Sequence, residues 1–395
     1  MKILQVHNEY QHKGGEEFVL KREFDLLASG NHIEQFIHSN DDLKANKEKI
    51  RLFFYLFYNP EAKSRLHRVI LKFQPDVVHI HNLFPRLTPS VLDACRDAKV
   101  PVVMTLHNFR LIDPGAMLID AKGRIFEKTI TGSAFSAIPR KSYRNSYLQT
   151  ALVAAYVDYH RKIKDTWNNK VNRLIVLTDF ARGKLVAGGI SENLLVKKPN
   201  FINDHYAEIT ATESLPANNY FLYVGRLSRE KGVKTLIETW NRYQLRSPLY
   251  IVGNGPLEDQ LKQMNQSKNV FFLGQKKPSE VLRLQYHAKC MIIPSICYEG
   301  FPLSIVEAFS MGTPVICTNF GGQAEIVNAE KNGLHFKPND SASLCSAVTL
   351  LNEKPEQVEE LSRSARETYV NQYTPEINYK LLTSIYKQVI TECKS

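Results

Sequence analysis

The chain has 395 residues, of which 43% are hydrophobic, and it carries 51 lysines and arginines against 40 acidic residues. This length suits two or three domains with ample hydrophobic cores. No run of eighteen apolar residues occurs, and the N-terminal segment enters a strand pattern directly, so we expect neither a membrane-spanning helix nor a signal peptide. Six cysteines form no C-x-x-C pair, which predicts reduced thiols in a cytoplasmic protein.

The formal net charge of +11 comes entirely from the first half of the chain. Residues 1–200 hold 31 basic and 20 acidic residues, whereas residues 201–395 hold 20 of each. A basic half suits an anionic partner such as nucleic acid or a membrane surface. Because no nucleic-acid-binding motif occurs, we expect an anionic membrane or an anionic substrate instead.

Strand and helix patterns alternate through the first half, which predicts a doubly wound parallel sheet of the α/β class. Helical patterns cover residues 18–27, 50–57, 64–73 and 90–98. Strands are expected at residues 2–7, 32–38, 77–80, 102–106 and 173–178, the last of which closes the sheet. The first domain is therefore expected to span residues 1–200.

A stretch rich in Thr, Ser, Asn and Pro follows, and we place a domain linker at residues 201–218. A second domain is expected at residues 219–375, with helical patterns from residue 341 onwards. Its strands are expected at residues 220–225, 249–253, 270–274, 290–294 and 314–318. Together, the two halves predict two Rossmann-like domains.

The second half contains one loop–helix–strand unit with the sequence YEGFPLSIVEAFSMGTPVICT. Pro302 suits the first turn of a helix, where its missing N–H costs nothing, and Gly312 stands where that helix would stop. The backbone N–H groups of Phe301–Leu303 at a helix start favour an anionic or hydroxyl-rich ligand. Glu299 in the loop and Glu307 on the helix are either solvated acids or ligand contacts.

A second candidate anion site follows the first strand of the second domain. Gly225 and Arg226 stand at a strand-to-helix turn, and Lys231 lies five residues beyond Arg226. A guanidinium and an ammonium at this turn either stay solvated or clamp a diphosphate. Gly253 lies in another loop at an expected sheet edge and is a candidate nucleotide contact.

Polar residues of the first domain stand at the carboxyl ends of expected strands, where open α/β sheets bind ligands. His107 follows the strand VVMTL, and His81 and Asn82 end the preceding strand. The turn after the first strand lacks the G-x-G-x-x-G spacing of dinucleotide oxidoreductases, but Gly14 and Gly15 let a ligand approach the backbone. The pattern alone leaves a structural role open for each of these residues.

The glycines, the proline and both acids of the Glu299–Glu307 stretch resemble the E-x7-E segment of retaining GT-B glycosyltransferases of family four. The G-R-x-x-x-x-K-G spacing at Gly225 and the strand-end histidine are similar to the same family, and the resemblance extends over nearly the whole chain. It implies that Glu299 contacts the hydroxyls of a donor sugar and that Glu307 contacts the nucleotide ribose. It also implies two domains facing each other across a cleft, with a helix at residues 376–395 crossing back to the first.

The resemblance further implies a UDP- or GDP-sugar donor and retention of configuration. No cofactor or metal ion is expected, because Arg226 and Lys231 would neutralise the leaving diphosphate. Catalytic roles are expected for Glu299, His107, Arg226 and Lys231. Donor contacts are expected from Gly14, Gly15, Gly225, Arg226, Lys231, Gly253, Glu299, Gly300, Phe301, Pro302, Leu303 and Glu307. Acceptor contacts are expected from His81, Asn82, Asn108 and Arg110.

Residues 108–187 are similar to a narrower group of these enzymes, which builds bacterial capsule, exopolysaccharide or O-antigen chains. This similarity implies a saccharide acceptor on a lipid diphosphate carrier. Several members carry paired cysteines after the HNFRL stretch, but Asp113 stands at one such place here, so no metal or redox role of those pairs is expected. The alternatives are a nucleotide-sugar epimerase or phosphorylase on the same fold, and a non-catalytic membrane scaffold.

Residues 139–173 combine eight basic residues with two acids around the stretch YLQTALVAAYVDYH. This pattern is either a core helix with a solvated face or a surface that binds anionic lipid. The second interpretation places the protein peripherally at the inner face of the membrane, beside its acceptor. The basic residues are Arg140, Lys141, Arg144, Arg161, Lys162, Lys164, Lys170 and Arg173.

Overall fold

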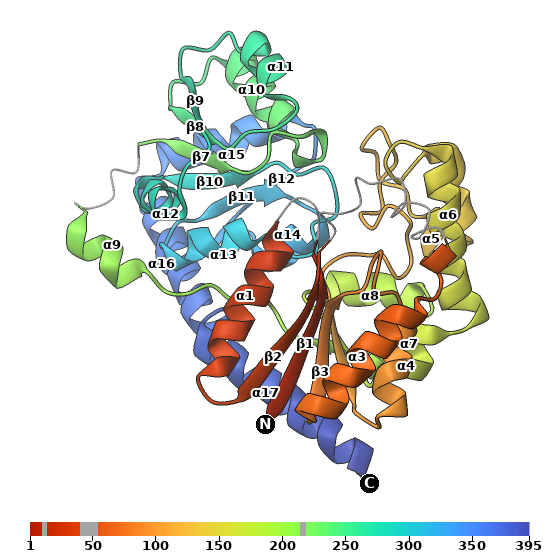
Figure 1. Ribbon diagram of the computed structural model, residues 1–395. Coiled ribbons are helices and arrows are strands. Elements are labelled where there is room, and N and C mark those ends of the chain that lie inside the picture. Colours follow the sequence, from red (N-terminus) through yellow and green to blue (C-terminus); the bar gives the residue numbers. More distant parts are fainter. Residues whose placement is uncertain (10–13, 40–53, 214–218, 395) are drawn as a thin grey trace. The chain divides into compact units, whose positions relative to one another are not determined.

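The computed structural model describes residues 1–9, 14–39, 54–213 and 219–394. Two compact units make up the chain: the first combines residues 1–121, 126–199 and 378–395, and the second combines residues 122–125 and 200–377. Each is built on a parallel six-stranded sheet, so the prediction of two Rossmann-like domains is confirmed (Figure 1). Among the described helices, none combines the length and the apolar character needed to cross a lipid bilayer.

The first sheet has the order β2-β1-β3-β4-β5-β6. Every residue of its central strands β3 and β4 is buried, including the polar residues His79, His81 and Asn82 of β3. The strands are β1 (Lys2–Asn8), β2 (His32–His38), β3 (Val77–Asn82), β4 (Val102–Leu106), β5 (Arg173–Val176) and β6 (Leu195–Lys197). The α-helices are α1 (Gly15–Ala28), α3 (Pro60–Phe73), α4 (Ser90–Asp97), α5 (Lys128–Thr131), α6 (Tyr147–Asp158), α7 (Thr166–Lys170) and α8 (Asp179–Ala187). Shorter turns are η2 (Ala134–Arg140), η3 (Tyr159–Ile163) and η4 (Glu192–Leu194).

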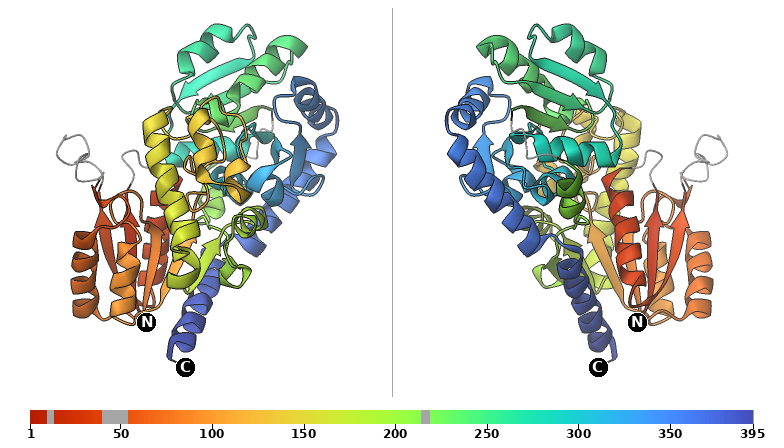
Figure 2. Two further views of the ribbon diagram at one scale, coloured as in Figure 1. Left: turned by 90° about the vertical axis from the view of Figure 1, so that its right-hand side faces the viewer. Right: turned by 90° about the vertical axis from the view of Figure 1, so that its left-hand side faces the viewer.

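The C-terminal helix α17 (Pro375–Lys394) packs on the first sheet (Figure 2). Leu382, Tyr386 and Val389 are fully buried and share a hydrophobic cluster with Ile3 of β1. Burying an aliphatic side chain of this size contributes about 1.5–3 kcal/mol. The helix is therefore part of the core of the first unit, although it follows the second unit in sequence.

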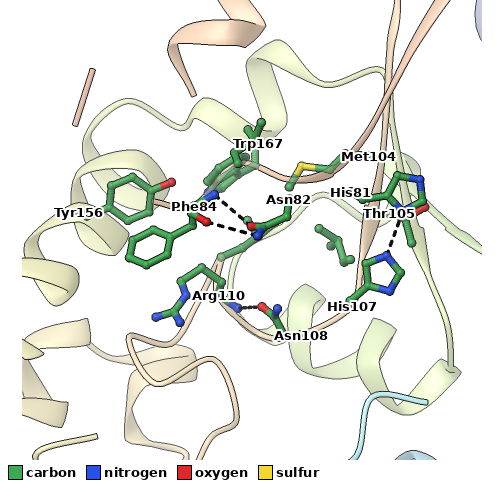
Figure 3. A pocket seen from close by; sticks show the side chains of 13 residues that line it. His81, Asn82, Phe84, Met104, Thr105, His107, Asn108, Arg110, Tyr156 and Trp167 are labelled. Atoms are coloured by element: carbon green, nitrogen blue, oxygen red, sulfur yellow. Dashed lines mark hydrogen bonds between the residues drawn. The ribbon is translucent and has the colours of Figure 1, made fainter. Parts of the chain in front are cut away.

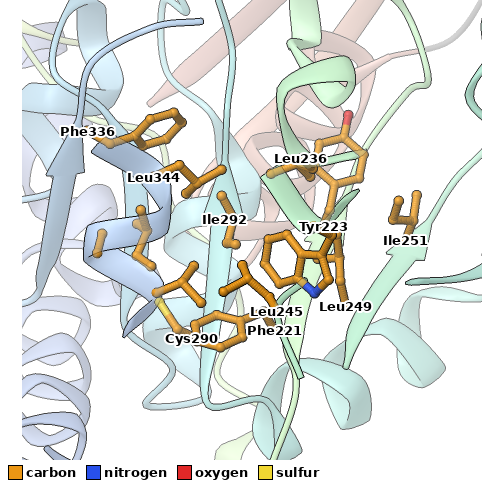
Figure 4. Close-up of a cluster of buried hydrophobic side chains, with 14 of the residues drawn as sticks. Phe221, Tyr223, Leu236, Leu245, Leu249, Ile251, Cys290, Ile292, Phe336 and Leu344 are labelled. Atoms are coloured by element: carbon orange, nitrogen blue, oxygen red, sulfur yellow. The ribbon is translucent and has the colours of Figure 1, made fainter. Parts of the chain in front are cut away.

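The second sheet has the order β12-β11-β10-β7-β8-β9, and its main hydrophobic cluster includes the fully buried Trp240. Figure 4 shows part of this cluster, including Phe221, Ile292 and Phe336. The strands are β7 (Phe221–Val224), β8 (Leu249–Val252), β9 (Val270–Gly274), β10 (Cys290–Ile293), β11 (Val315–Thr318) and β12 (Gly333–Phe336). The helices are α9 (Tyr206–Thr212), η5 (Arg229–Lys231), α10 (Val233–Tyr243), α11 (Glu258–Met264), α12 (Pro278–His287), α13 (Leu303–Ser310), α14 (Gly321–Ile326), α15 (Ser341–Glu353) and α16 (Pro355–Gln372).

Each sheet has one switch point, where the chain leaves one side of its first strand and continues on the other. In the second sheet this point lies between β7 and β10, and in the first it lies between β1 and β3. Open α/β sheets bind ligands beyond the carboxyl ends of the strands at such points. Lys231 follows β7, Glu299 follows β10, and His81 lies in β3, so these three predicted site residues lie beside the switch points of the two sheets.

Four elements differ from the predictions. The strand at residues 173–178 does not close the first sheet, because β6 pairs with β5 beyond it. Two strands were missed, the three-residue β6 and the four-residue β12. The predicted linker contains the helix α9, and Pro302 is the N-cap of α13 instead of a residue of its first turn. The predicted helix at residues 50–57 falls largely outside the described residues.

Candidate functional site

The side chains of Lys231, Glu299 and Ser295 form a connected group at the switch point of the second sheet. Lys231 Nζ lies 2.6 Å from Glu299 Oε1, and Ser295 Oγ donates a hydrogen bond of 2.7 Å to the same oxygen. Lys231 comes from the turn after β7, whereas the other two come from the loop after β10. The structure thus brings two predicted site residues into direct contact, together with a serine that was not predicted.

Both charged groups of this pair are ionised near neutral pH. Burial raises the pKa of the Glu299 carboxyl, but the Lys231 ammonium and the Ser295 hydroxyl outweigh burial and leave that pKa below its ordinary value. Burial lowers the pKa of Lys231, but the Glu299 carboxylate reverses this effect, so the net pKa of Lys231 is raised. The Lys231 side chain is 31% exposed and that of Glu299 is 14% exposed, so an anionic ligand can reach the ammonium from solvent.

Two glycines let the loops around this pair approach one another. Gly232 has a φ of 67°, and a Cβ there would lie 1.9 Å from the carbonyl oxygen of Pro294. Gly322 donates its N–H to the carbonyl of Glu299 at 3.1 Å, and a Cβ there would lie 2.5 Å from that oxygen. A side chain at either position would displace the loop that carries Glu299.

Helix α13 begins directly after this loop. Pro302 is its N-cap, and Gly300 precedes it in the loop. The buried residues Val306 and Phe309 anchor the helix in a hydrophobic cluster with β10 and β11. The N–H groups of its first turn and the positive end of its dipole therefore occupy a fixed position that favours an anion. Glu307 lies one turn further along α13 and is partly exposed.

The remaining predicted donor contacts of the second unit lie at the same sheet edge. Gly225 and Arg226 follow β7, and the Arg226 side chain is exposed. Gly253 follows β8 with a φ of 132°, and a Cβ there would lie 1.9 Å from the carbonyl oxygen of Gly225. Phe301 and Leu303 pack against the hydrophobic cluster of α13. Their side chains are held against the core, and contacts of their backbone groups with a donor stay a prediction.

The first unit contains a second connected group, and this one is sealed from solvent. Glu23 of α1, Lys198 after β6, and His79 and His81 of β3 are at most 3% exposed. Lys198 Nζ lies 2.5 Å from Glu23 Oε1, and His81 Nε2 lies 3.3 Å from Glu23 Oε2. His81 Nδ1 in turn lies 3.1 Å from Nε2 of His107, which follows β4. A chain of polar contacts thus runs from α1 to the strand-end histidine.

The charges in this group are well defined. Burial raises the pKa of Glu23, but Lys198 and His81 outweigh burial, and the pKa lies well below its ordinary value. Burial lowers the pKa of both His81 and His107, so these rings are neutral at pH 7. Glu23, His79 and His81 offer donor atoms within 4.8 Å of one another, a spacing that a metal ion could use. However, the Lys198 ammonium already supplies positive charge to the carboxylate.

A cavity of about 30 Å³ lies beside His107 and is lined by Asn108 and Arg110 as well (Figure 3). Asn108 Oδ1 accepts a hydrogen bond of 3.0 Å from the backbone N–H of Arg110. The Arg110 guanidinium lies 4.6 Å from the ring centroid of Phe84 and 5.1 Å from that of Tyr143. His81 and Asn82 also line this cavity, so the structure brings five of the predicted first-domain residues together around it.

Asn82, predicted to contact the acceptor, and Gly14, predicted to contact the donor, both make structural contacts within the first unit. The Asn82 amide donates to the carbonyls of Asn8 and Phe84 and accepts from the Phe84 N–H, so it shapes the loop after β3. Asn82 also lines the cavity beside His107, and an acceptor contact by this side chain stays a prediction. Gly14 is the N-cap of α1, which begins at Gly15, and a donor contact by either glycine stays a prediction.

Sequence reasoning missed Glu23, Lys198, His79 and Ser295. One signal was available for Glu23, because it shares the spacing of the buried face of α1 with Val19, Leu20 and Leu27. An acid on an apolar stripe must have a buried partner. His79 and His81 alternate on one face of β3, which indicated that both point to the same helix layer. Nothing near Lys198 in the sequence indicated its partner, which lies 175 residues away.

Two family models match the chain in adjoining segments. The model described as Glycosyltransferase Family 4 matches residues 25–205, and the model described as Glycosyl transferases group 1 matches residues 208–368. The two segments correspond closely to the two structural units and together cover most of the chain.

Individual relatives agree with the models. A glycogen synthase of Mycobacterium tuberculosis is 33% identical over 159 residues, which is 38% of this chain and 38% of the relative, so well under half of that protein's length is matched. The O-antigen chain mannosyltransferase C of Escherichia coli is 27% identical over 45% of this chain and 48% of its own. The solved structure of Anabaena Alr3699/HepE in complex with UDP has a TM-score of 0.71 at 16% identity, over 98% of this chain and 100% of that one. The same protein was solved with UDP-glucose, with a TM-score of 0.66. On these matches, the chain belongs to the GT-B glycosyltransferases, with a first half of the Family 4 type and a second half of the group 1 type.

Proposed function

We propose that this protein transfers a sugar from a UDP- or GDP-sugar to a saccharide acceptor with retention of configuration. The observation that carries the proposal is the accessible Lys231–Glu299 pair beside the N-terminus of α13, at the switch point of the second sheet. This arrangement offers a cation and a helix start to an anion, and a fixed carboxylate to hydroxyl groups. A nucleotide diphosphate sugar carries both kinds of group. That Alr3699/HepE was solved with UDP and with UDP-glucose supports this choice of donor.

In the proposed reaction the second unit stabilises the leaving group. Lys231, Arg226 and the first N–H groups of α13 would neutralise the negative charge that develops on the departing diphosphate. The site needs no metal ion for this purpose, because two cationic side chains and a helix dipole serve the same end. Glu299 would hold the sugar hydroxyls and Glu307 the ribose, the roles that the sequence resemblance implied.

Retention follows from where the acids are expected to act. Double displacement needs a carboxylate nucleophile at the anomeric carbon, and inversion needs a general base at the acceptor hydroxyl. In the proposal Glu299 serves the outer hydroxyls and the neutral His107 serves as a hydrogen-bonding group. The departing phosphate oxygen is then the base that takes the proton of the acceptor, on the same face of the sugar.

The acceptor and the membrane belong to the first unit in this proposal. Exposed apolar side chains occur along η2, α6 and η3: Phe135, Tyr147, Leu148 and Ile163 are 47–72% exposed. Exposed basic residues accompany them: Arg140, Arg144, Lys162 and Lys164. Exposed apolar groups beside basic ones suit the surface of an anionic bilayer, where a lipid-linked acceptor would be held. We call these eight residues the amphipathic face.

Four residues of the predicted basic cluster lie outside this face. Lys141 is only partly exposed, Lys170 pairs with Asp93, and Arg173 pairs with Glu392. The fourth is buried. Arg161 is only 7% exposed, and its guanidinium donates to the backbone carbonyls of Thr129, Ile130 and Gly132 and to Asp158. It therefore joins α5 to the end of α6 and η3, and its replacement would damage the fold. The prediction that Arg161 belongs to a lipid-binding surface is wrong, because the carbonyls of a short helix end required a buried donor.

The test of the proposed function is a screen of nucleotide sugars for thermal stabilisation, followed by release of nucleoside diphosphate with and without a saccharide acceptor. A donor at 100 times its dissociation constant should add about 2.7 kcal/mol of stability. Lys231→Ala should abolish most of the release, whereas Lys234→Ala, an exposed lysine of α10 paired with Glu238, should leave it unchanged. Stabilisation by no nucleotide sugar, or equal activity of the two variants, would contradict the proposal.

A further inference from the structure

The sealed group of the first unit ends at His107, and its geometry determines which nitrogen of that ring carries the proton. The starting point is Glu23, whose two oxygens have different partners. Oε1 faces the Lys198 ammonium at 2.5 Å, and Oε2 faces His81 Nε2 at 3.3 Å. Lys198 is held in turn by Asn378 Oδ1 at 3.2 Å, and Asn378 donates to the carbonyl of Pro199, so the lysine cannot swing away.

The proton of His81 lies on Nε2. Neither this nitrogen nor Glu23 Oε2 has a hydrogen bond of good geometry in the described part of the chain, and the two atoms lie 3.3 Å apart, whereas His79 Nδ1 lies 3.8 Å from Oε2. If Nε2 carried no proton, its lone pair would face a carboxylate oxygen in the interior, and the two buried atoms could form no hydrogen bond with each other. With the proton on Nε2, the contact becomes a charge-assisted hydrogen bond, and His81 Nδ1 presents a lone pair.

The proton of His107 follows from that of His81. His81 Nδ1 and His107 Nε2 are 3.1 Å apart, and the two rings lie within 17° of parallel. Because Nδ1 of His81 is the acceptor, Nε2 of His107 must be the donor. His107 is neutral, since burial lowers its pKa, and a neutral ring has one proton. Its Nδ1 is therefore an acceptor.

We propose that Glu23 and His81 are positioning residues, which hold His107 as the Nε2–H tautomer and so present Nδ1 as a hydrogen-bond acceptor for a ligand hydroxyl. A hydroxyl donates to this nitrogen, whereas a carbonyl, phosphate or carboxylate oxygen would meet a lone pair and be rejected. That the hydroxyl belongs to a sugar rests on the proposed function. The tautomer itself does not.

The experiment is NMR of the full chain with ¹⁵N-labelled histidine at pH 7, read through the couplings of ring protons to both ring nitrogens. The shifts of the two nitrogens distinguish a protonated from an unprotonated site. His81→Gln and His107→Gln assign the two rings among the twelve histidines by loss of signal. We expect a proton on Nε2 in both rings of the unaltered protein. A proton on His107 Nδ1, or protons on both nitrogens, would overturn the proposal.

Glu23→Gln is a sharper test, because it changes one atom. The amide oxygen should remain toward Lys198, which places the NH₂ group against His81 Nε2. That nitrogen must then become the acceptor, His81 moves its proton to Nδ1, and His107 moves its proton to its own Nδ1. The variant should therefore invert both tautomers and weaken binding of a hydroxyl-bearing ligand by on the order of ten-fold. Unchanged tautomers in a folded variant would overturn the relay.

Tyr386→Phe is the matched control in the same buried group. Its hydroxyl contacts His79 Nδ1 at 2.7 Å and no atom of the Glu23–His81–His107 line, so both tautomers should stay as they are. A metal ion found at Glu23, His79 and His81 by elemental analysis would also overturn the proposal, because it would bind His81 Nε2 and remove its proton. If no nucleotide sugar is turned over while the tautomers are as expected, the proposed function fails and this inference stands.

Discussion

Replacing Lys231 by methionine is the most informative single change, because it leaves Glu299 without its cation while keeping the volume of the side chain. The pair is intermediate in burial, at 31% and 14% exposed. Exposed pairs contribute about 0–1 kcal/mol, and removal of one partner from a fully buried pair costs about 3–5 kcal/mol. We therefore expect Lys231→Met to lower the stability of the second unit by about 1–3 kcal/mol at pH 7.

The pH dependence of this loss is fixed by the pKa of Glu299. That pKa is depressed in the folded protein, so the contribution of the pair is present above the unfolded-state pKa, about 4.3, and is lost as pH falls through the lower folded-state pKa. In Lys231→Met the burial of Glu299 is no longer offset, and its pKa should rise above the ordinary value. The difference in stability between the two proteins should therefore be full above the raised pKa of Glu299 in the variant, and should shrink as pH falls through that pKa toward the lower pKa of the unaltered protein.

The assay is urea denaturation of the full chain at pH 7, 5 and 3.5, with Trp167 of the first unit replaced by phenylalanine in every protein compared. Tryptophan fluorescence then reports Trp240, which is buried in the second unit. Lys234→Met is the control, because the ion pair of Lys234 with Glu238 on α10 is 59% and 46% exposed. It should cost no more than about 0.5 kcal/mol at any of these pH values. An equal loss for both variants, or a loss for Lys231→Met that is the same at pH 3.5 as at pH 7, would refute the reasoning.

Three further predictions concern the proposed function. Glu307→Ala should weaken nucleotide binding by about ten- to hundred-fold, since a hydrogen bond to a charged group contributes roughly 1.5–3 kcal/mol. Glu299→Ala should bind free nucleoside diphosphate at least as well as the unaltered protein, because Lys231 is released, and yet it should lose sugar transfer. Calorimetry measures the binding, and release of product measures the transfer. The unaltered protein should co-sediment with anionic vesicles, and this binding should weaken as salt rises. The double variant Leu148→Ser, Ile163→Ser should bind them less. Equal binding of the unaltered protein to neutral vesicles would count against the amphipathic face. The product should keep the α configuration of an α-linked donor, seen as a small anomeric proton coupling in NMR, and a β-linked product would falsify the retaining mechanism. Turnover should persist in EDTA. Loss of turnover that Mg²⁺ restores would show that Arg226, Lys231 and the start of α13 do not stabilise the leaving diphosphate without a metal ion.

The fold and the accessible site were largely predictable because their signals are local. Glu299 lies next to a glycine, which permits the tight turn of the loop, and close to a proline, which fixes φ at the start of α13. The loop and the helix start therefore follow from a few adjacent residues. Ser295 was not predictable, since it stands four residues before Glu299 in a stretch without a motif, and only the turn of the loop brings its hydroxyl to the carboxylate.

The sealed group could not be assembled from the sequence for a different reason. Glu23 and Lys198 are 175 residues apart, and His79 and Tyr386 are 307 apart, so their pairing depends on how α1, β6 and α17 pack on one sheet. Sequence spacing shows which residues face the same way within one element, as for His79 and His81. It does not show which element covers them.

The two lysine–glutamate pairs show how burial decides what an ion pair can do. Lys198–Glu23 is completely buried in the first unit, and Lys231–Glu299 lies at the carboxyl edge of the second sheet with both side chains partly exposed. Separating the buried pair would leave charges in the interior, which costs several kcal/mol, so no ligand can exchange for either partner. The accessible pair loses little when an incoming phosphate takes the place of the carboxylate at Lys231, because both anions satisfy the same ammonium. On our proposals, the same kind of ion pair fixes the orientation of His107 through Glu23 and His81 in one unit, and would exchange its carboxylate for a ligand phosphate in the other.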